Sequence, residues 1–141
     1  MPLEKQKMLI KESVYSTNTD RLRLLDIAIE TILKERLDIS LDRFELYLIL
    51  DEAITNAMDH GNRWDKSKKV ILKIEKVEKE SVKIYIKDEG IGFNPKILPD
   101  VLNNNGKLNP RGRGIYIIRK FCPIEWNVVG NEVCITLETK N

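Results

Sequence analysis

Apolar residues recur every three or four positions in the first half of the chain, which is the spacing of an amphipathic helix. One such run predicts a helix over residues 19 to about 37, and capping residues cluster just before it at 16–20. A second, longer run predicts a helix from 41 to about 60, and Gly61 suits its C-terminal end. The chain is therefore expected to begin with a short edge strand at 7–15 and two consecutive helices.

Alternation of apolar and polar residues replaces the helical spacing after position 67, as expected for strands with one buried face. The C-terminal part of the chain combines both patterns. It is expected to contain a hairpin of strands at 68–77 and 81–88, a short helix at 113–121 and a closing hairpin of strands at 124–129 and 131–138.

Residues 89–114 form a long connection that carries three prolines, five glycines and a run of three asparagines. A loop of this length inside a compact domain is usually a functional lid or a disordered segment. We therefore expect a flexible lid over about 93–111, with ligand-binding residues beside it.

Composition limits the classes of protein that this chain can represent. Its 141 residues fit a single domain over 1–141. The 24 Lys and Arg and the 22 Asp and Glu are scattered along the chain and leave a net charge of only +2, which disfavours nucleic-acid binding. The widely separated Cys122 and Cys134 and the single His60 cannot assemble a zinc site, so the cysteines are expected to be buried, reduced thiols. No apolar run approaches the roughly 20 residues of a membrane helix, and a cytoplasmic protein is expected.

A polar stripe on the second predicted helix is the first candidate for chemistry. Glu52, Asn56, Asp59 and His60 follow one another at helical spacing and share one face. An amide oxygen suits Mg²⁺, and a carboxylate one turn away can accept a proton from an attacking hydroxyl. Taken alone, the same stripe is also expected of an ordinary solvated helix face.

The end of the second predicted strand is the next candidate. Asp88 has the same parity as the apolar residues of its strand, so its carboxylate is expected to face the core, and Gly90 and Gly92 follow at once. A buried acceptor beside a glycine turn can bind the exocyclic amino group of adenine. An ordinary Asp-Gly turn at a strand end would have the same sequence.

Two glycines flanked by arginines open the helix predicted near residue 113. The amides of a helix N-terminus bind phosphate, and an arginine stabilises the charge on a transferring phosphoryl group. The alternative is a glycine-rich loop that meets a helix cap. A P-loop is excluded because no GxxxxGK[ST] sequence is present.

The three segments resemble, in this order and spacing, the nucleotide-binding segments of the ATPase superfamily shared by DNA gyrase, heat-shock chaperones and histidine kinases. They read DEAITNAMDHGN, DEGIGF and RGRGIYII. Over essentially its whole length the chain is most similar to the small anti-sigma-factor serine/threonine kinases of this superfamily. The resemblance implies an α+β fold, a two-layer α/β sandwich in which a mixed, mainly antiparallel sheet is covered by about three helices.

The same resemblance implies roles in binding ATP and Mg²⁺. Asn56 would coordinate Mg²⁺, Asp88 would accept a hydrogen bond from adenine, and Glu52 would act as the general base. The other implied site residues are Asp59, His60, Gly90, Gly92, Phe93, Gly112, Gly114 and Val133, with Arg111 or Arg113 near the γ-phosphate. Val133 departs from the family, which often has a Gly-Thr pair at 132–133, so a hydroxyl near the adenine is lost.

The implied activity is phosphorylation of a serine or threonine in an anti-anti-sigma (STAS-type) protein, combined with sequestration of a sigma factor. Relatives of this kind suggest a homodimer, with no nucleic-acid or membrane partner. Two alternatives stay open. The chain could be a nucleotide-dependent protein-binding regulator in which Glu52 only holds water near the metal, or a catalytic fragment of a sensor histidine kinase.

Overall fold

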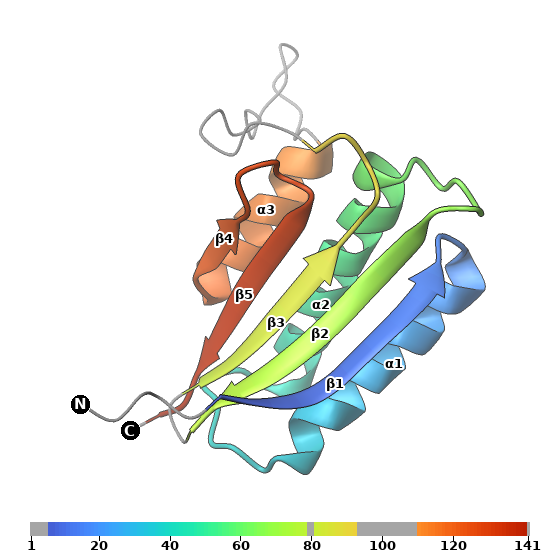
Figure 1. The fold of residues 1–141 in the computed structure, drawn as a ribbon. Coiled ribbons are helices and arrows are strands. Elements are labelled where there is room, and N and C mark those ends of the chain that lie inside the picture. Colours follow the sequence, from blue (N-terminus) through green and yellow to red (C-terminus); the bar gives the residue numbers. More distant parts are fainter. Residues whose placement is uncertain (1–5, 79–80, 93–109, 141) are drawn as a thin grey trace.

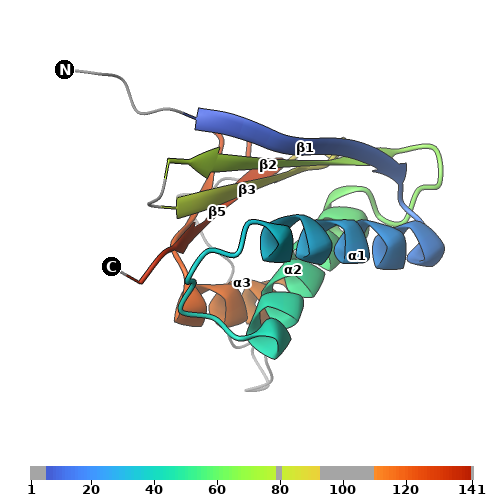
Figure 2. The ribbon, with the colours of Figure 1, turned by 90° about the horizontal axis from the view of Figure 1, so that it is seen from below.

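Helices cover one face of a five-stranded sheet in the computed structural model, which describes residues 6–78, 81–92 and 110–140 (Figures 1 and 2). The elements in chain order are β1 (Gln6–Tyr15), α1 (Asn18–Lys34), α2 (Arg43–Asn56), the π-helix η1 (Ala57–Gly61), β2 (Lys69–Val77), β3 (Ser81–Lys87), α3 (Pro110–Phe121), β4 (Ile124–Trp126) and β5 (Glu132–Glu138). Figure 2 shows the sheet and the helices as two layers. The predicted α+β sandwich is confirmed.

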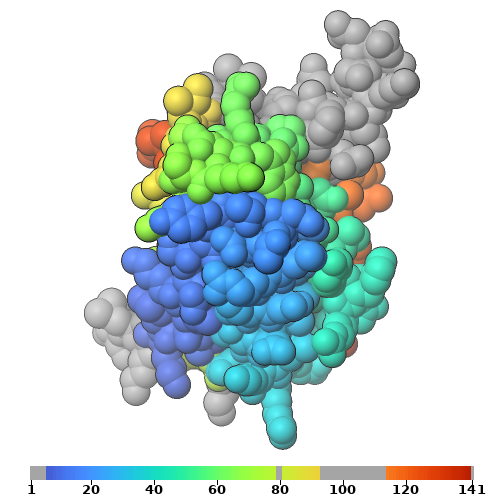
Figure 3. Space-filling view, turned by 90° about the vertical axis from the view of Figure 1, so that its right-hand side faces the viewer, coloured from blue at the N-terminus to red at the C-terminus, as the bar shows by residue number. Residues whose placement is uncertain are grey.

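The sheet has the strand order β1-β2-β3-β5-β4. Every pairing between these described strands is antiparallel, which confirms the expected mainly antiparallel sheet. The alternation along β2 and β3 is confirmed too, since Leu72 pairs with Ile86 and Ile74 with Ile84, all on the buried face. Seen from the β1 edge, β1 and α1 form one continuous surface (Figure 3).

Side-chain caps fix where the first two helices begin. Thr17 accepts a hydrogen bond from the amide of Asp20 at the start of α1 (3.1 Å). Asp42 and Glu45 form a reciprocal capping box at the start of α2, at 2.8 and 3.0 Å. The first helix ends at Lys34, three residues before the predicted end, and the chain then reverses at Arg36, whose φ is 50°.

The core lies between the helices α1 and α2 and the middle of the sheet. Leucine, isoleucine and valine side chains from both layers are fully buried there, as the apolar spacing predicts. The innermost of them are Leu24, Ile49, Leu50, Ile54, Val70, Leu72, Ile74, Val82, Ile84 and Ile135. Because one side of α2 packs on the sheet, its polar residues lie on the other sides. Asp51 faces α1, and Glu52 and Asn56 face α3.

The second helix continues into η1 without a break, so the predicted helix to about residue 60 is confirmed. Its end does not use the predicted glycine stop, because Gly61 has no left-handed φ. The chain instead turns back at Arg63 and Trp64, whose φ values are 52° and 54°, and the Trp64 amide donates to the Met58 carbonyl (2.8 Å). The π-helix and the turn after it lie directly beside the end of β3.

The C-terminal elements differ from the predicted ones in extent. The last helix begins at Pro110, three residues before the predicted start, and β4 is a three-residue strand. The predicted lid at 93–111 falls mostly outside the described residues. Cys122 is buried and Cys134 half-buried, both as free thiols, and burial raises the pKa of the Cys122 thiol to about 11.

Candidate functional site

Asp88 stands at the end of β3 with its carboxylate on the core face of the sheet. Only 7% of the residue is exposed, which confirms the orientation that its parity predicts. Its Oδ1 atom accepts a hydrogen bond from the Gly90 amide (2.8 Å), and its own amide donates to the Asn131 carbonyl (2.9 Å). The β3 end and the turn before β5 therefore hold this acceptor in place.

Glycines let three backbone segments close around Asp88. A Cβ atom added to Gly61 would collide with the Asp88 carboxylate, and one added to Gly90 would collide with the Gly61 carbonyl oxygen. Gly92 has a φ of 79°, and a Cβ there would strike the Val129 carbonyl. The predicted glycine turn is thus sterically required, whereas Phe93 lies outside the described residues.

A cleft opens beside the Asp88 carboxylate, between the helices and the last strands. Its walls are mostly apolar and include Ile86, Ile115, Ile118, Trp126 and Val133. Asn56, Asp88 and Asn131 add hydrogen-bonding groups at its edges. A mostly apolar cleft with a few placed polar groups is the usual form of a site for a small molecule or cofactor.

Val133 lines this cleft from β5, where it pairs with Ile86 on one side and Trp126 on the other. All three side chains in that row are apolar. The row therefore contributes no hydroxyl to the cleft.

Three predicted site residues meet where α2 packs against α3: Glu52 and Asn56 from α2, and Gly114 from α3. A Cβ atom added to Gly114 would lie 2.7 Å from Asn56 Nδ2 and 2.9 Å from Glu52 Oε2. Glu52 and Asn56 are one helical turn apart on α2, and both are half-buried. Asn56 also lines the cleft of Asp88, so the cleft and the junction form one continuous site.

Arg111, Gly112 and Arg113 lie in the first turn of α3, the helix that supplies Gly114. The amides of this turn have no partner within the helix, which is the condition for binding an anion. The arginine side chains lie outside the described part of the structure.

Asp59 and His60, also predicted as site residues, do not line the Asp88 cleft. Both are on η1, with His60 Nε2 3.9 Å from Asp59 Oδ2. They line a separate, open depression with Arg63 and Trp64, and they are not among the residues that line the Asp88 cleft.

Sequence reasoning missed Asn62, which is only 1% exposed. Its Nδ2 donates to Ser16 Oγ and to the Lys69 carbonyl, both at 2.9 Å, and its Oδ1 accepts from the Glu89 amide at 2.8 Å. One carboxamide thus joins the ends of β1, β2 and β3 beside Asp88. The only signal in the sequence is an Asn directly after His60-Gly61.

Asn131 is a second residue near Asp88 that no sequence motif identifies. Its carbonyl accepts from the Asp88 amide, and its side-chain Oδ1 accepts from Asn127 Nδ2 (2.7 Å). Asn127 Oδ1 in turn accepts from the Gly130 amide at 2.8 Å. This asparagine-rich turn holds the β4–β5 hairpin against the end of β3.

A buried acceptor in an apolar cleft, next to a helix N-terminus and a helix junction with a carboxylate and an amide, is the arrangement expected of a nucleotide-binding α+β domain. The chain belongs to the histidine kinase-like ATPase domain family, whose model matches residues 16–137. The family predicted from the three segments is confirmed.

Two known proteins show how far this likeness extends. The chain is 30% identical over 80 residues to an anti-sigma F factor of Shouchella clausii (strain KSM-K16). That match covers 55% of this chain and 54% of the relative, so it spans about half of the relative's length. The structure superposes on the mycobacterial sensor histidine kinase MprB with a TM-score of 0.53 at 15% identity, over 93% of this chain and 99% of that one, which shows the fold. Within the described residues, no helix is long and apolar enough to cross a membrane.

Proposed function

We propose that this chain is an ATP-dependent serine/threonine protein kinase that acts as an anti-sigma factor. The observation that carries the proposal is the junction at which Glu52 and Asn56 meet Gly114 beside the Asp88 cleft. It supplies a carboxylate and an amide oxygen where a nucleotide seated in the cleft would present its phosphates.

The residues of the cleft suit the base of ATP. The Asp88 carboxylate would accept from the adenine amino group, and the apolar walls would cover the ring faces. The phosphates would extend toward the first turn of α3, where the helix amides and dipole favour negative charge.

The junction also suits Mg²⁺. Magnesium in phosphotransfer sites takes one or two protein oxygens and completes its coordination with phosphates and water. No group of three or more His, Cys, Asp or Glu that could hold a metal occurs within 6–78, 81–92 and 110–140, so the metal would depend on the nucleotide, with Asn56 as its protein ligand. The bound ion would neutralise charge on the β- and γ-phosphates.

Glu52 would be the general base. It would take the proton of the partner's hydroxyl as that oxygen forms a bond to the γ-phosphorus and the bond to the bridging oxygen of ADP breaks. Arg111 or Arg113, in the first turn of α3, would stabilise the charge on the transferring group. The half-buried position of Glu52 next to α3 keeps its carboxylate close to that turn.

The partners in this proposal are a sigma factor, which the chain would sequester, and an anti-anti-sigma protein of the STAS type, which it would phosphorylate. Support comes from the likeness to an anti-sigma F factor. A homodimer, as the functional form, belongs to the same proposal.

Transfer of label from [γ-³²P]ATP tests the activity. The purified chain would be incubated with Mg²⁺, labelled ATP and a candidate anti-anti-sigma protein, and the products would be treated with acid and with base. Acid-stable, base-labile label on the partner is the expected result, since phosphoserine and phosphothreonine behave in this way. Label that acid removes would indicate a phosphohistidine, and nucleotide-dependent partner binding without label would indicate a regulator that does not transfer phosphate.

A further inference from the structure

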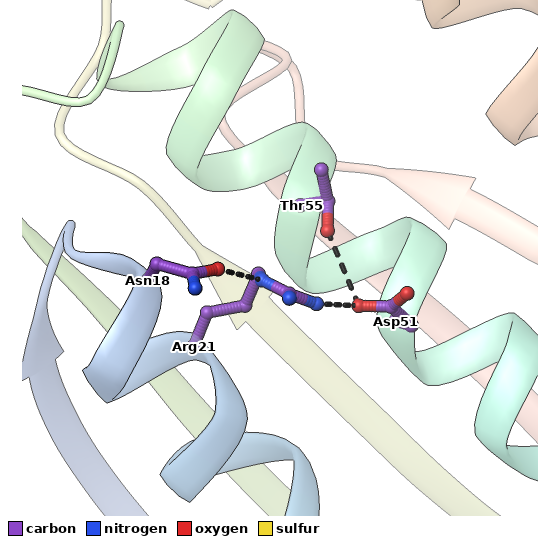
Figure 4. Close-up of polar contacts among 4 residues, drawn as sticks. All are labelled: Asn18, Arg21, Asp51 and Thr55. Atoms are coloured by element: carbon purple, nitrogen blue, oxygen red, sulfur yellow. Dashed lines mark hydrogen bonds and ion pairs between the residues drawn. The ribbon is translucent and has the colours of Figure 1, made fainter.

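An ion pair joins α1 to α2 on a side of α2 other than the one that meets α3. The Arg21 guanidinium donates through Nη1 to Asp51 Oδ1 (Figure 4). The two side chains are 18% and 31% exposed, so the pair is partly shielded from water and from salt.

Both members of this pair have a second contact that restrains them. Asn18 Oδ1 accepts from Arg21 Nε at 3.0 Å, and Thr55 Oγ1 donates to the same Asp51 oxygen at 3.3 Å. A guanidinium held by two acceptors and a carboxylate held by two donors lose less freedom on pairing than two unrestrained side chains do. The contact therefore fixes a geometry rather than merely balancing charge.

The position of the pair on α2 gives it a consequence for the nucleotide site. Asp51 immediately precedes Glu52, and Thr55 immediately precedes Asn56. Successive residues are about 100° apart around a helix. Asp51 and Thr55 therefore form one stripe along α2, and Glu52 and Asn56 form the stripe beside it. α1 contacts one stripe through Arg21, and Gly114 of α3 touches the other. Any rotation of α2 about its axis moves both.

We infer that Arg21 is a positioning residue, whose ion pair with Asp51 sets the rotation of α2 that presents Glu52 and Asn56 to the phosphates. The inference rests on the proposed function. The two ends of the proposed site depend on different elements: the adenine end on Asp88 and the strands, and the phosphate end on α2. Loss of the pair should impair phosphotransfer and Mg²⁺-dependent binding and leave the adenine end intact.

A second ion pair of α1 offers a matched control. Glu35 and Lys76 are 3.3 Å apart and 25% and 27% exposed, and they join the other end of α1 to β2. Neither member of this pair belongs to α2. Glu35→Gln therefore removes a comparable contact of α1 without acting on the stripe that carries Asp51.

The experiment compares Arg21→Gln with Glu35→Gln in the full chain. Three quantities are measured: ADP affinity in EDTA, the gain in ATP affinity on adding Mg²⁺, and the single-turnover rate of transfer to the anti-anti-sigma protein. We expect Arg21→Gln to slow transfer by at least about tenfold and to reduce the Mg²⁺-dependent gain, with ADP affinity unchanged. Glu35→Gln should change none of the three.

Asp51→Asn provides a second route to the same result, because it removes the charge and keeps an acceptor for Thr55. The double variant, Arg21→Gln with Asp51→Asn, should lose no more transfer rate than either single variant, because both substitutions remove the same ion pair. Equal effects of Arg21→Gln and Glu35→Gln, or parallel losses of ADP affinity and transfer, would overturn the inference. If the wild-type chain transfers no phosphate, the proposed function fails, and the Mg²⁺-dependent gain alone then decides whether Arg21 positions α2.

Discussion

Gly114 and Asn56 approach each other so closely across the α2–α3 junction that a Cβ on Gly114 would stand 2.7 Å from the Asn56 Nδ2 atom. The same Cβ would stand 2.9 Å from Glu52 Oε2. The absent side chain is thus what allows α3 to lie against the two residues that we propose for Mg²⁺ binding and proton transfer.

Gly114→Ala tests this relationship, because helix propensity and the contact act in opposite directions. Alanine favours a helix over glycine by about 1 kcal/mol, yet here its methyl would displace Asn56 and Glu52. We expect Mg·ATP affinity to fall by at least about tenfold, measured by calorimetry, with no gain in Tm. Lys120→Ala, on the exposed side of α3, is the control. A higher Tm with unchanged affinity would contradict the close contact.

Glu52→Gln should separate binding from chemistry. Glutamine keeps the size of the side chain and cannot accept the hydroxyl proton, so Mg·ATP affinity should persist while phosphotransfer falls by about a hundredfold or more. Single-turnover transfer and calorimetry on the same preparation measure the two effects. Glu30→Gln, an exposed carboxylate of α1, should be silent. Unchanged transfer in Glu52→Gln would remove this residue as the base.

Asp88→Asn should weaken the binding of the base. The change replaces one acceptor oxygen by an NH₂ donor facing the adenine amino group, and a hydrogen bond to a charged acceptor contributes about 1.5–3 kcal/mol. ADP affinity without Mg²⁺ should therefore fall by about tenfold to about a hundredfold. Asp65→Asn is the control, since that carboxylate lies in an exposed turn bonded to Ser67. Wild-type affinity in Asp88→Asn would place the adenine elsewhere.

Val133→Thr should strengthen nucleotide binding. Threonine has nearly the same shape and adds a hydroxyl in an otherwise apolar row of the cleft. One hydrogen bond to the bound base or its water contributes about 0.5–1.5 kcal/mol, so ADP should bind up to about tenfold more tightly. Val128→Thr, at a 96% exposed position, controls for the general effect of the substitution. Weaker binding in Val133→Thr would show that the position works only as an apolar wall.

Asn62→Ala should destabilise the fold. Three partners of the carboxamide, on Ser16, Lys69 and Glu89, would lose a hydrogen bond at a buried place. Each buried group left unsatisfied costs about 1–3 kcal/mol, and we expect the free energy of unfolding in urea to drop by about 2–4 kcal/mol after partial rehydration. Ser67→Ala, which removes an exposed hydrogen bond, should cost far less. A loss below that of the control would mean that Asn62 is not a structural clamp.

The sequence predicted the features that depend on local periodicity. The orientation of Asp88 followed from the two-residue repeat of its strand, and the spacing of Glu52 and Asn56 followed from the helical turn. The contacts of Gly61 and Gly114 could not be predicted, because they depend on which segments meet in space. The same holds for Arg21 and Asp51, whose charges resemble any others on solvated helix faces until α1 is placed beside α2.

The hydrogen bonds of Asn62 reach Ser16, 46 residues away in the chain, and Glu89, 27 residues away. Bringing such distant partners together requires the closure of long loops, which costs chain entropy. The site is therefore complete only in the folded domain, and a nucleotide would bind that state in preference to the unfolded chain. By mass action, ligand at a hundred times its Kd adds about 2.7 kcal/mol to the folded state. The concentration of nucleotide around the protein would thus affect the stability of the folded state and the lifetime of the protein, whether or not any phosphate is transferred.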